Sequence, residues 1–154
     1  MNIVRAKGED AGTLTDIAFS AKRHWGYPER WIEAWQDTLT VRADFIDAHE
    51  TYAAVVAGRT VGFYALRRVG DRLRLEHLWV SPEAMNQGVG RAMLTHAVER
   101  GKALGFRAVE IESDPNADGF YKKIGARRVG ASIGELDGQV RELPVLIYQM
   151  DGTP

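Results

Sequence analysis

The stretch from residue 73 to residue 104 constrains the fold most, because it joins an apolar strand to a long helix through a short glycine-rich turn. Residues 74–80 carry aliphatic and aromatic side chains and predict a strand, which Pro82 ends because proline cannot donate to a sheet ladder. The helix is expected to begin near Val89, and its apolar residues recur every four positions. Gly105 is expected to end this helix in the left-handed conformation.

The turn at residues 86–91 contains two glycines, Gly88 and Gly90. A backbone without side chains can approach a bulky anion, and the unpaired N–H groups of the first helical turn point at the same place. This pattern favours a phosphate cradle, and its alternative is a tight strand-to-helix turn that binds nothing. The triphosphate loop and the dinucleotide fingerprint are excluded, because Gly-Lys-Ser/Thr and a third glycine are both missing.

The rest of the chain predicts helices and strands on both sides of this unit. Residues 51–56 and 60–66 are typical of a hairpin, and Gly70-Asp71 predicts a second hairpin turn that leads into the central strand. Three antiparallel strands therefore precede the glycine turn. Residues 108–112 form a strand after the long helix, and such a crossover normally makes the pair parallel. The predicted fold is α/β, with a mixed sheet of about six or seven strands flanked by helices. Further predicted elements are strands at residues 2–5, 127–133 and 142–150, helices at 14–24, 28–35, 44–49 and 117–124, an extended stretch at 39–42 and a loop at 134–138.

The composition is that of an ordinary globular chain, with 45% hydrophobic and 27% charged residues, and it predicts one domain over residues 1–154. A net charge of −1 argues against a nucleic acid or an anionic membrane as partner. The chain has no cysteine, which excludes disulfides, thiolate metal sites and thiol catalysis. No apolar signal core or membrane-spanning stretch is visible, so a cytoplasmic protein is expected. His49 and His96 lie in no recognisable ligand spacing, so no metal is expected.

Two segments carry a family resemblance. Residues 78–83 read LWVSPE and run into QGVGR at residues 87–91, and residues 116–126 read NADGFYKKIGA. The first resembles the acyl-CoA pyrophosphate loop of the GCN5-related N-acetyltransferase (GNAT) family, Gln/Arg-x-x-Gly-x-Gly/Ala. The second resembles that family's Asn-x-x-Ala-x-x-Phe-Tyr-x-Lys-x-Gly-Phe segment, and the order of predicted elements is similar over nearly the whole chain. The chain departs from these motifs at Met85, Gly119 and Ala126.

The resemblance implies an acyltransferase that moves an acetyl group from acetyl-CoA to a primary amine of a small-molecule or peptide acceptor. Without a cysteine to carry the acyl group, the transfer is expected to be direct, in a ternary complex. The resemblance also implies a central strand that splays from its neighbour, and it allows a homodimer. The implied cofactor contacts are Leu78, Trp79, Val80 and Asn116 for the pantetheine arm, Gln87, Gly88, Val89, Gly90 and Arg91 for the pyrophosphate, and Tyr121 for the thioester.

Acetyl transfer needs a base for the ammonium proton and an acid for the leaving thiolate. Tyr121 is the candidate acid, because a phenol stays neutral at physiological pH; its alternative is a core tyrosine. Glu76, just before the cofactor edge, is the candidate base; its alternative is an ion pair with Arg72 or Arg74. His77, on the opposite strand face, is the reserve base and otherwise a structural residue.

The acceptor site is expected to involve Trp25, Tyr27 and His77. Trp25 and Tyr27 fall between the first two helices, a segment that borders the acceptor in this fold. Their alternative is helix packing, which the helical spacing favours for Trp31 and Trp35.

Two further readings concern the acceptor and the class of protein. Glu110 and Glu112 are expected on a solvated strand face; the alternative is an acidic wall opposite the cofactor, which would attract a cationic acceptor. The alternative to an enzyme is a non-catalytic acyl-CoA sensor on the same fold, and the presence of Tyr121 favours the enzyme.

Overall fold

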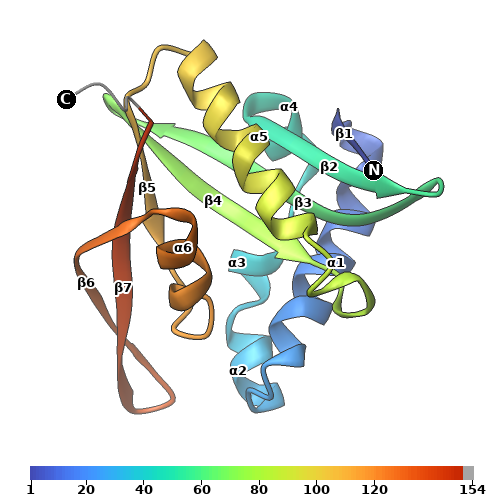
Figure 1. Cartoon of the computed structure of the whole chain (residues 1–154). Helices are drawn as coiled ribbons and strands as arrows, with labels where there is room; N and C mark the ends of the chain where they lie inside the picture. Colours follow the sequence, from blue (N-terminus) through green and yellow to red (C-terminus); the bar gives the residue numbers. More distant parts are fainter. Residues whose placement is uncertain (151–154) are drawn as a thin grey trace. The chain divides into compact units, whose positions relative to one another are not determined.

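A seven-stranded mixed sheet with the order β1-β2-β3-β4-β5-β7-β6 forms the frame of the computed structural model, which describes residues 1–150 (Figure 1). The strands are β1 (Asn2–Arg5), β2 (Glu50–Val56), β3 (Arg59–Val69), β4 (Arg72–Val80), β5 (Ala108–Glu112), β6 (Arg127–Leu136) and β7 (Gln139–Gln149). The helices are α1 (Ala11–His24), α2 (Glu29–Ala34), α3 (Gln36–Leu39), α4 (Ala43–Ala48), α5 (Val89–Ala103) and α6 (Asp118–Ile124), with 3-10 turns at Gly8–Asp10 and Pro82–Ala84.

The strand directions confirm the predicted mixed α/β sheet. β1, β2 and β3 are antiparallel neighbours, β4 and β5 are parallel, and β7 runs antiparallel to both β5 and β6. The register of β4 with β5 pairs Leu73 with Val109 and Arg74 with Glu110, near the beginning of β4. A ladder confined to that end is what a splayed central strand requires.

The chain divides into two compact units. The first comprises Met1–Leu66 with Glu76–Ala97, and the second comprises Arg67–Leu75 with the described residues from Val98 onward. The prediction of one domain over residues 1–154 stays a prediction, and its last four residues lie outside the described part of the chain.

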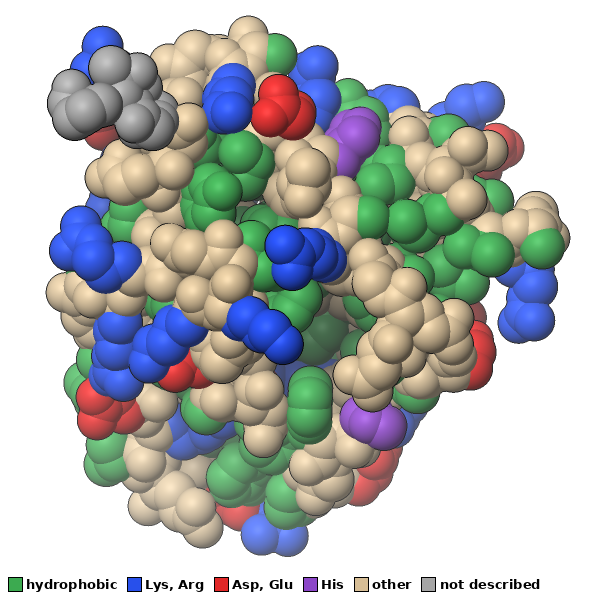
Figure 2. All heavy atoms as spheres, viewed as in Figure 1, with side chains coloured by type: hydrophobic (Ala, Val, Ile, Leu, Met, Phe, Trp, Pro, Cys, Tyr) green, Lys and Arg blue, Asp and Glu red, His purple; other side chains and the backbone are tan. Residues whose placement is uncertain are grey.

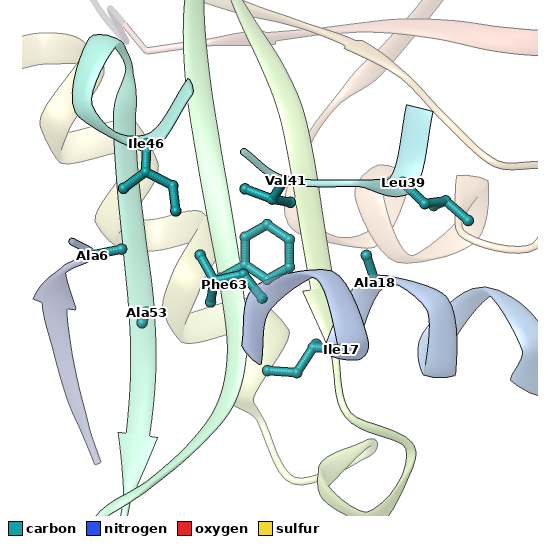
Figure 3. Packing of buried hydrophobic residues seen from close by; sticks show 9 residues of the cluster. Ala6, Ile17, Ala18, Leu39, Val41, Ile46, Ala53 and Phe63 are labelled. Carbon is teal, nitrogen blue, oxygen red and sulfur yellow. The ribbon is translucent and has the colours of Figure 1, made fainter. Parts of the chain in front are cut away.

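The core of the first unit gathers around Phe63 of β3, which is fully buried (Figure 3). Ile17 and Ala18 of α1 pack in the same cluster. At the preceding position of β3, a Cβ built on Gly62 would lie 3.0 Å from the terminal carbon of Met93 in α5. Successive strand residues point to opposite faces, so α1 and the first part of α5 cover opposite faces of β3.

The second unit contains a long hairpin that corrects one prediction. The loop expected at residues 134–138 is instead a two-residue turn, Asp137 and Gly138, with φ of 55° and 74°. Two positive φ values define a type I′ turn, and Asp-Gly is a preferred sequence for it. β6 and β7 are therefore longer than predicted, because the glycine at position 134 belongs to the strand and does not begin a loop.

The other corrections are small. The helix predicted at residues 28–35 is α2, followed by the separate turn α3 after Trp35. Leu39 ends α3, and the expected extended stretch begins one residue later, at Thr40.

The surface carries charged side chains of both signs, as the near-zero net charge of the chain predicts. Figure 2 shows Lys and Arg side chains scattered over one face, with Asp and Glu among them and apolar side chains between. Within residues 1–150, no helix has both the length and the apolar character needed to cross a membrane.

Candidate functional site

The glycine loop between β4 and α5 is shaped by two residues in the left-handed conformation, Asn86 with φ 62° and Gly88 with φ 83°. Gln87 fixes the loop from within, because its Nε2 donates to the carbonyl of Glu83 at 3.1 Å. A Cβ built on Gly88 would meet no atom within 4 Å, so the space in front of this backbone is open. A glycine is needed here for its conformation, and the bare backbone leaves room for a ligand.

The first turn of α5 adds hydrogen-bond donors beside this open space. The first intrahelical bond runs from the N–H of Ala92 to the carbonyl of Gly88, at 3.0 Å. The preceding N–H groups, at positions 89 to 91, have no acceptor within the helix. The first turn holds no acidic residue, whereas Arg91 is exposed in it and Val89 is buried. The positive end of the helix dipole therefore meets no carboxylate from its own turn, which suits an anion.

The end of β4 leads into this loop and is held firmly. The N–H of Ser81 donates to the carbonyl of Val61 at 2.8 Å, which ties the strand end to β3. Leu78, Trp79 and Val80 are all half-buried. The residues expected to contact the pantetheine arm and the pyrophosphate from β4 and α5 thus lie in one continuous, fixed segment of the first unit.

His77 is buried among aromatic rings. Its ring centroid lies 5.7 Å from that of Phe45 and 5.6 Å from that of Phe63, and 8% of the residue is exposed. The indole of Trp79 donates to Nδ1 of His77 at 3.1 Å. Burial lowers the pKa of His77 to about 4, so the ring is neutral at physiological pH. These surroundings favour the structural alternative over the reserve base and the acceptor contact.

Glu76 is half-buried between two buried neighbours, Leu75 and His77. The arginines weighed as its partners both reach β5 in the second unit. Arg72 pairs with Glu110 at 2.9 Å, and Arg74 pairs with Glu112 at 3.0 Å. Glu110 and Glu112 therefore have arginine partners on the neighbouring strand, which weakens the alternative of an acidic wall that attracts a cationic acceptor.

Tyr121 lies on α6 in the second unit, where 7% of it is exposed. Burial raises the pKa of the phenol above its ordinary value of 10, and the nearby Asp114 carboxylate adds to this effect. The phenol is therefore protonated at physiological pH, as a proton donor must be. Asn116 is exposed just before α6, and both its backbone N–H and its Nδ2 donate to Oδ1 of Asp114, at 2.8 and 2.9 Å.

Trp25 and Tyr27, in the link between α1 and α2, have different surroundings. Trp25 is 41% exposed, and the ring of His24 packs edge-on against it, with 5.6 Å between the ring centroids. Tyr27 stacks on Trp31 at 5.8 Å and meets Trp35 edge-on at 5.0 Å. Trp31 and Trp35 thus pack the helices as their spacing indicated, and Tyr27 shares that packing.

Sequence reasoning missed Lys22, a buried lysine on α1. Its ammonium nitrogen lies 4.2 Å from the ring centroid of Trp35, 5.0 Å from that of Tyr27 and 5.9 Å from that of Trp79. The helical spacing could have predicted the burial of Lys22, because Lys22 follows Ala18 by four residues on the buried face of α1. We call Lys22 with these three rings the lysine cage.

Comparison with known proteins places the chain in a family. Residues 15–126 match the acetyltransferase (GNAT) family. Over 95% of each chain, the sequence is 28% identical to the peptidyl-lysine N-acetyltransferase YjaB of Salmonella typhimurium. The fold is similar to that of a GCN5-related N-acetyltransferase from Rhodopseudomonas palustris, with a TM-score of 0.82 and 21% identity over 96% of this chain and 94% of that one. It is also similar to the PaiA N-acetyltransferase of Thermoplasma acidophilum in complex with coenzyme A, with a TM-score of 0.76 and 19% identity over 96% and 98%. The chain therefore belongs to the acetyltransferase (GNAT) family and is an acyltransferase.

Proposed function

We propose that this protein is an acetyl-CoA-dependent N-acetyltransferase that transfers the acetyl group directly to a primary amine. The glycine loop carries the proposal, because it combines open space at Gly88, donor N–H groups and a first helical turn without a carboxylate. The coenzyme A bound to the T. acidophilum relative supports the cofactor. We further propose that the protein works in the cytoplasm.

The proposed cofactor contacts follow the family pattern. Residues 87–91 would bind the pyrophosphate through backbone N–H groups, with Arg91 adding positive charge. Leu78, Trp79 and Val80 would bind the pantetheine arm through the backbone of β4, together with Asn116. Acetyl-CoA supplies the activated acyl group, and the protein supplies position and proton transfer.

The proposed reaction uses one base and one acid. Glu76 accepts a proton from the acceptor's ammonium, directly or through water, and the amine nitrogen then attacks the thioester carbon. As the N–C bond forms and the C–S bond breaks, the phenol of Tyr121 donates its proton to the leaving thiolate. The nitrogen, now bonded to the acetyl group, releases its second proton, which restores the phenol, and Glu76 returns its proton to solvent. The raised pKa of Tyr121 supports this role, because the group is protonated before each turnover. The amine acceptor is a small molecule or a peptide, and the name of the S. typhimurium relative points to peptidyl-lysine.

Calorimetric titration with acetyl-CoA and CoA tests the proposal. The wild type is expected to bind both, and Gly88→Glu to bind about a hundredfold more weakly, because a carboxylate would face the pyrophosphate. Gly58→Glu is the matched control, since Gly58 has φ 76° and open space around it, but lies in the β2–β3 turn. Equal losses in both variants, or no binding by the wild type, would mean that the glycine loop is only a turn.

Turnover separates an enzyme from a sensor. Free CoA released by a panel of amines and lysine peptides can be measured with a thiol reagent, without background from a protein that has no cysteine. Tight CoA binding without thiol release from any amine would favour the sensor.

A further inference from the structure

A surface pocket of about 380 Å³ lies in the second unit, at the end of the sheet where β4 and β5 begin (Figure 1). Its walls come from the turn between β3 and β4, the link between α5 and β5, the first residues of β4 and β5, and Ile147 of β7. Pockets that hold small molecules begin at about this volume. None of the lining residues is a proposed catalytic or cofactor contact, so the proposed reaction gives this pocket no role.

Part of the pocket wall is apolar, because strand alternation turns aliphatic side chains away from α5. A Cβ built on Gly101 of α5 would lie 3.1 Å from a methyl carbon of Leu73, so Leu73 faces this helix. The register places Ala108 of β5 and Ile147 of β7 one residue out of step with Leu73, so both face away from α5. The half-buried ring of Phe106, in the link before β5, also lines the pocket. These side chains offer an apolar surface to the body of a ligand.

Two of the lining charges cancel each other. A guanidinium nitrogen of Arg72 lies 2.9 Å from Oε2 of Glu110, and 20% of the Glu110 side chain is exposed. The carboxylate of Glu110 is thus neutralised within the pocket wall and repels an incoming anion only weakly.

The remaining charges leave an excess of positive charge at the pocket. Arg107 lines the pocket, is exposed and makes no ion pair within residues 1–150. Arg68 adds a second positive charge, because its Cζ lies 5.1 Å from the ring centroid of the lining Phe106. Asp71, whose carboxylate is likewise unpaired in the described part of the chain, offsets only one of them. An excess of positive charge favours an anion, and a planar guanidinium can hold a carboxylate through two parallel hydrogen bonds.

We propose that this pocket binds a small organic carboxylate, with its charge on Arg107 and its apolar body against Phe106, Ala108 and Ile147. The apolar wall contributes hydrophobic burial, and the arginine fixes the orientation of the ligand. The site goes beyond the proposed function, because it uses residues of the second unit that take no part in the transfer of the acetyl group.

Amide NMR of the isotope-labelled protein, titrated with 3-phenylpropanoate or hexanoate, tests the proposal. The signals of Gly105, Phe106 and Arg107 are expected to shift and to saturate, with a dissociation constant of roughly one millimolar. The neutral 3-phenylpropanamide and hexanamide have nearly the same shape and should bind at least about tenfold more weakly, because they cannot form the charged pair. Added salt should weaken the binding of the carboxylates and leave that of the amides unchanged.

Charge variants test the assignment of the carboxylate to Arg107. Arg107→Gln is expected to raise the dissociation constant of both carboxylates about tenfold. Asp71→Asn removes the opposing charge and is expected to lower that constant about twofold to threefold. Arg59→Gln is the matched control, because it removes the same charge from an exposed arginine at the beginning of β3, in the first unit, and should bind like the wild type.

Several results would overturn the proposal. No saturable shift with either carboxylate, or shifts confined to residues outside the pocket, would mean that the pocket does not bind this class of ligand. Weaker binding by Asp71→Asn would show that the ligand is not held as an anion, and inorganic phosphate binding as tightly as the carboxylates would show that the apolar wall contributes nothing. Acetyl-CoA titration of Arg107→Gln, expected to match the wild type, keeps a failure of this proposal separate from a failure of the proposed function.

Discussion

The indole Nε1 of Trp79 donates a hydrogen bond to Nδ1 of His77 across 3.1 Å. Because Nδ1 accepts this bond, the imidazole carries its single proton on Nε2. The same indole ring lies 5.9 Å from the ammonium of Lys22, so it contacts a buried histidine and a buried lysine together. A second proton on His77 would have to be placed on Nδ1, where it would face the Trp79 donor, in surroundings that already lower the pKa.

His77 is therefore expected to make stability depend on pH. Its pKa is about 4 in the folded protein, against 6.5 for an ordinary histidine. Between these values the unfolded chain binds more protons, so the free energy of unfolding falls as the pH falls, and the contribution is constant above 6.5. The whole difference corresponds to about 3 kcal/mol. Urea unfolding at about pH 7 and about pH 5 measures the first part of this loss.

Two variants isolate the histidine in that measurement. His77→Gln keeps an acceptor for Trp79 but cannot titrate, and it should lose most of the pH dependence in this window. His24→Gln, which changes an exposed histidine at the end of α1, should keep the wild-type slope. A His77→Gln protein with the same slope as the wild type would show that another group is responsible.

Tyr121→Phe is expected to lower kcat by about 10² to 10⁴-fold, the usual contribution of a general acid, while acetyl-CoA affinity changes little. The phenol is buried and protonated, so the variant removes the hydroxyl group that donates the proton and leaves the packing of the aromatic ring almost intact. Steady-state kinetics give kcat, and calorimetry on the same preparation gives the affinity for acetyl-CoA. Tyr148→Phe, in β7 of the same unit, is the control and should be active. Unchanged turnover in Tyr121→Phe would remove this residue from the mechanism.

Glu76→Gln is expected to lower kcat/KM about a hundredfold, because the amide cannot accept the proton of the acceptor's ammonium. His77→Ala should lose much less, since the pKa of His77 is too low for it to serve as the base near neutral pH. Both variants should bind acetyl-CoA like the wild type. Unchanged kcat/KM in Glu76→Gln would assign the base to another group.

The lysine cage predicts a measurable coupling between Lys22 and Trp35, whose centroid is 4.2 Å from the ammonium. Lys22→Met, Trp35→Leu and the double variant form a cycle, and urea unfolding should give a coupling of about 1–2 kcal/mol because the lysine is buried. The matched cycle uses Arg68 and Phe106, where the Cζ of an exposed Arg68 lies 5.1 Å from the ring centroid of Phe106. The coupling in this cycle should be below about 1 kcal/mol. Equal values in the two cycles would contradict a special role for burial.

The parts of the structure that the sequence predicts correctly are those with local causes. β4 and α5 follow from their own apolar patterns, and the conformation of Gly105, with φ 90°, follows from its place after the helix. The Asp137–Gly138 turn was also local, but the nearby Gly134 suggested a longer loop. Local signals of this kind fixed the order of nearly every element.

The features that the sequence left open depend on residues far apart in the chain. The state of His77 is set by Phe45 and Phe63, and the lysine cage joins α1 to Trp35 and Trp79. Likewise, Arg72 has a glutamate partner on β5, 38 positions away. Side-chain partners at such distances follow from tertiary packing, and neither periodicity nor turn chemistry encodes them.

The last prediction concerns Gly62 of β3 and Gly101 of α5, because each glycine is crowded by a different kind of neighbour. A Cβ on Gly62 would lie 2.9 Å from the backbone carbonyl oxygen of Trp79, whereas a Cβ on Gly101 would lie 2.8 Å from the sulfur of Met150. A carbonyl in a strand cannot move aside, but a methionine side chain can adopt another rotamer. Gly62→Ala is therefore expected to cost about 2–3 kcal/mol.

Gly101→Ala is expected to stay within about 1 kcal/mol of the wild type, because the better helix propensity of alanine offsets the displacement of Met150. Urea unfolding of the two variants side by side measures the difference. Should Gly101→Ala prove the more damaging, the terminal sulfur of Met150 would be held as rigidly as backbone. In that case Met150→Ala in the Gly101→Ala background should recover part of the loss, because it removes the atom that the new methyl group meets.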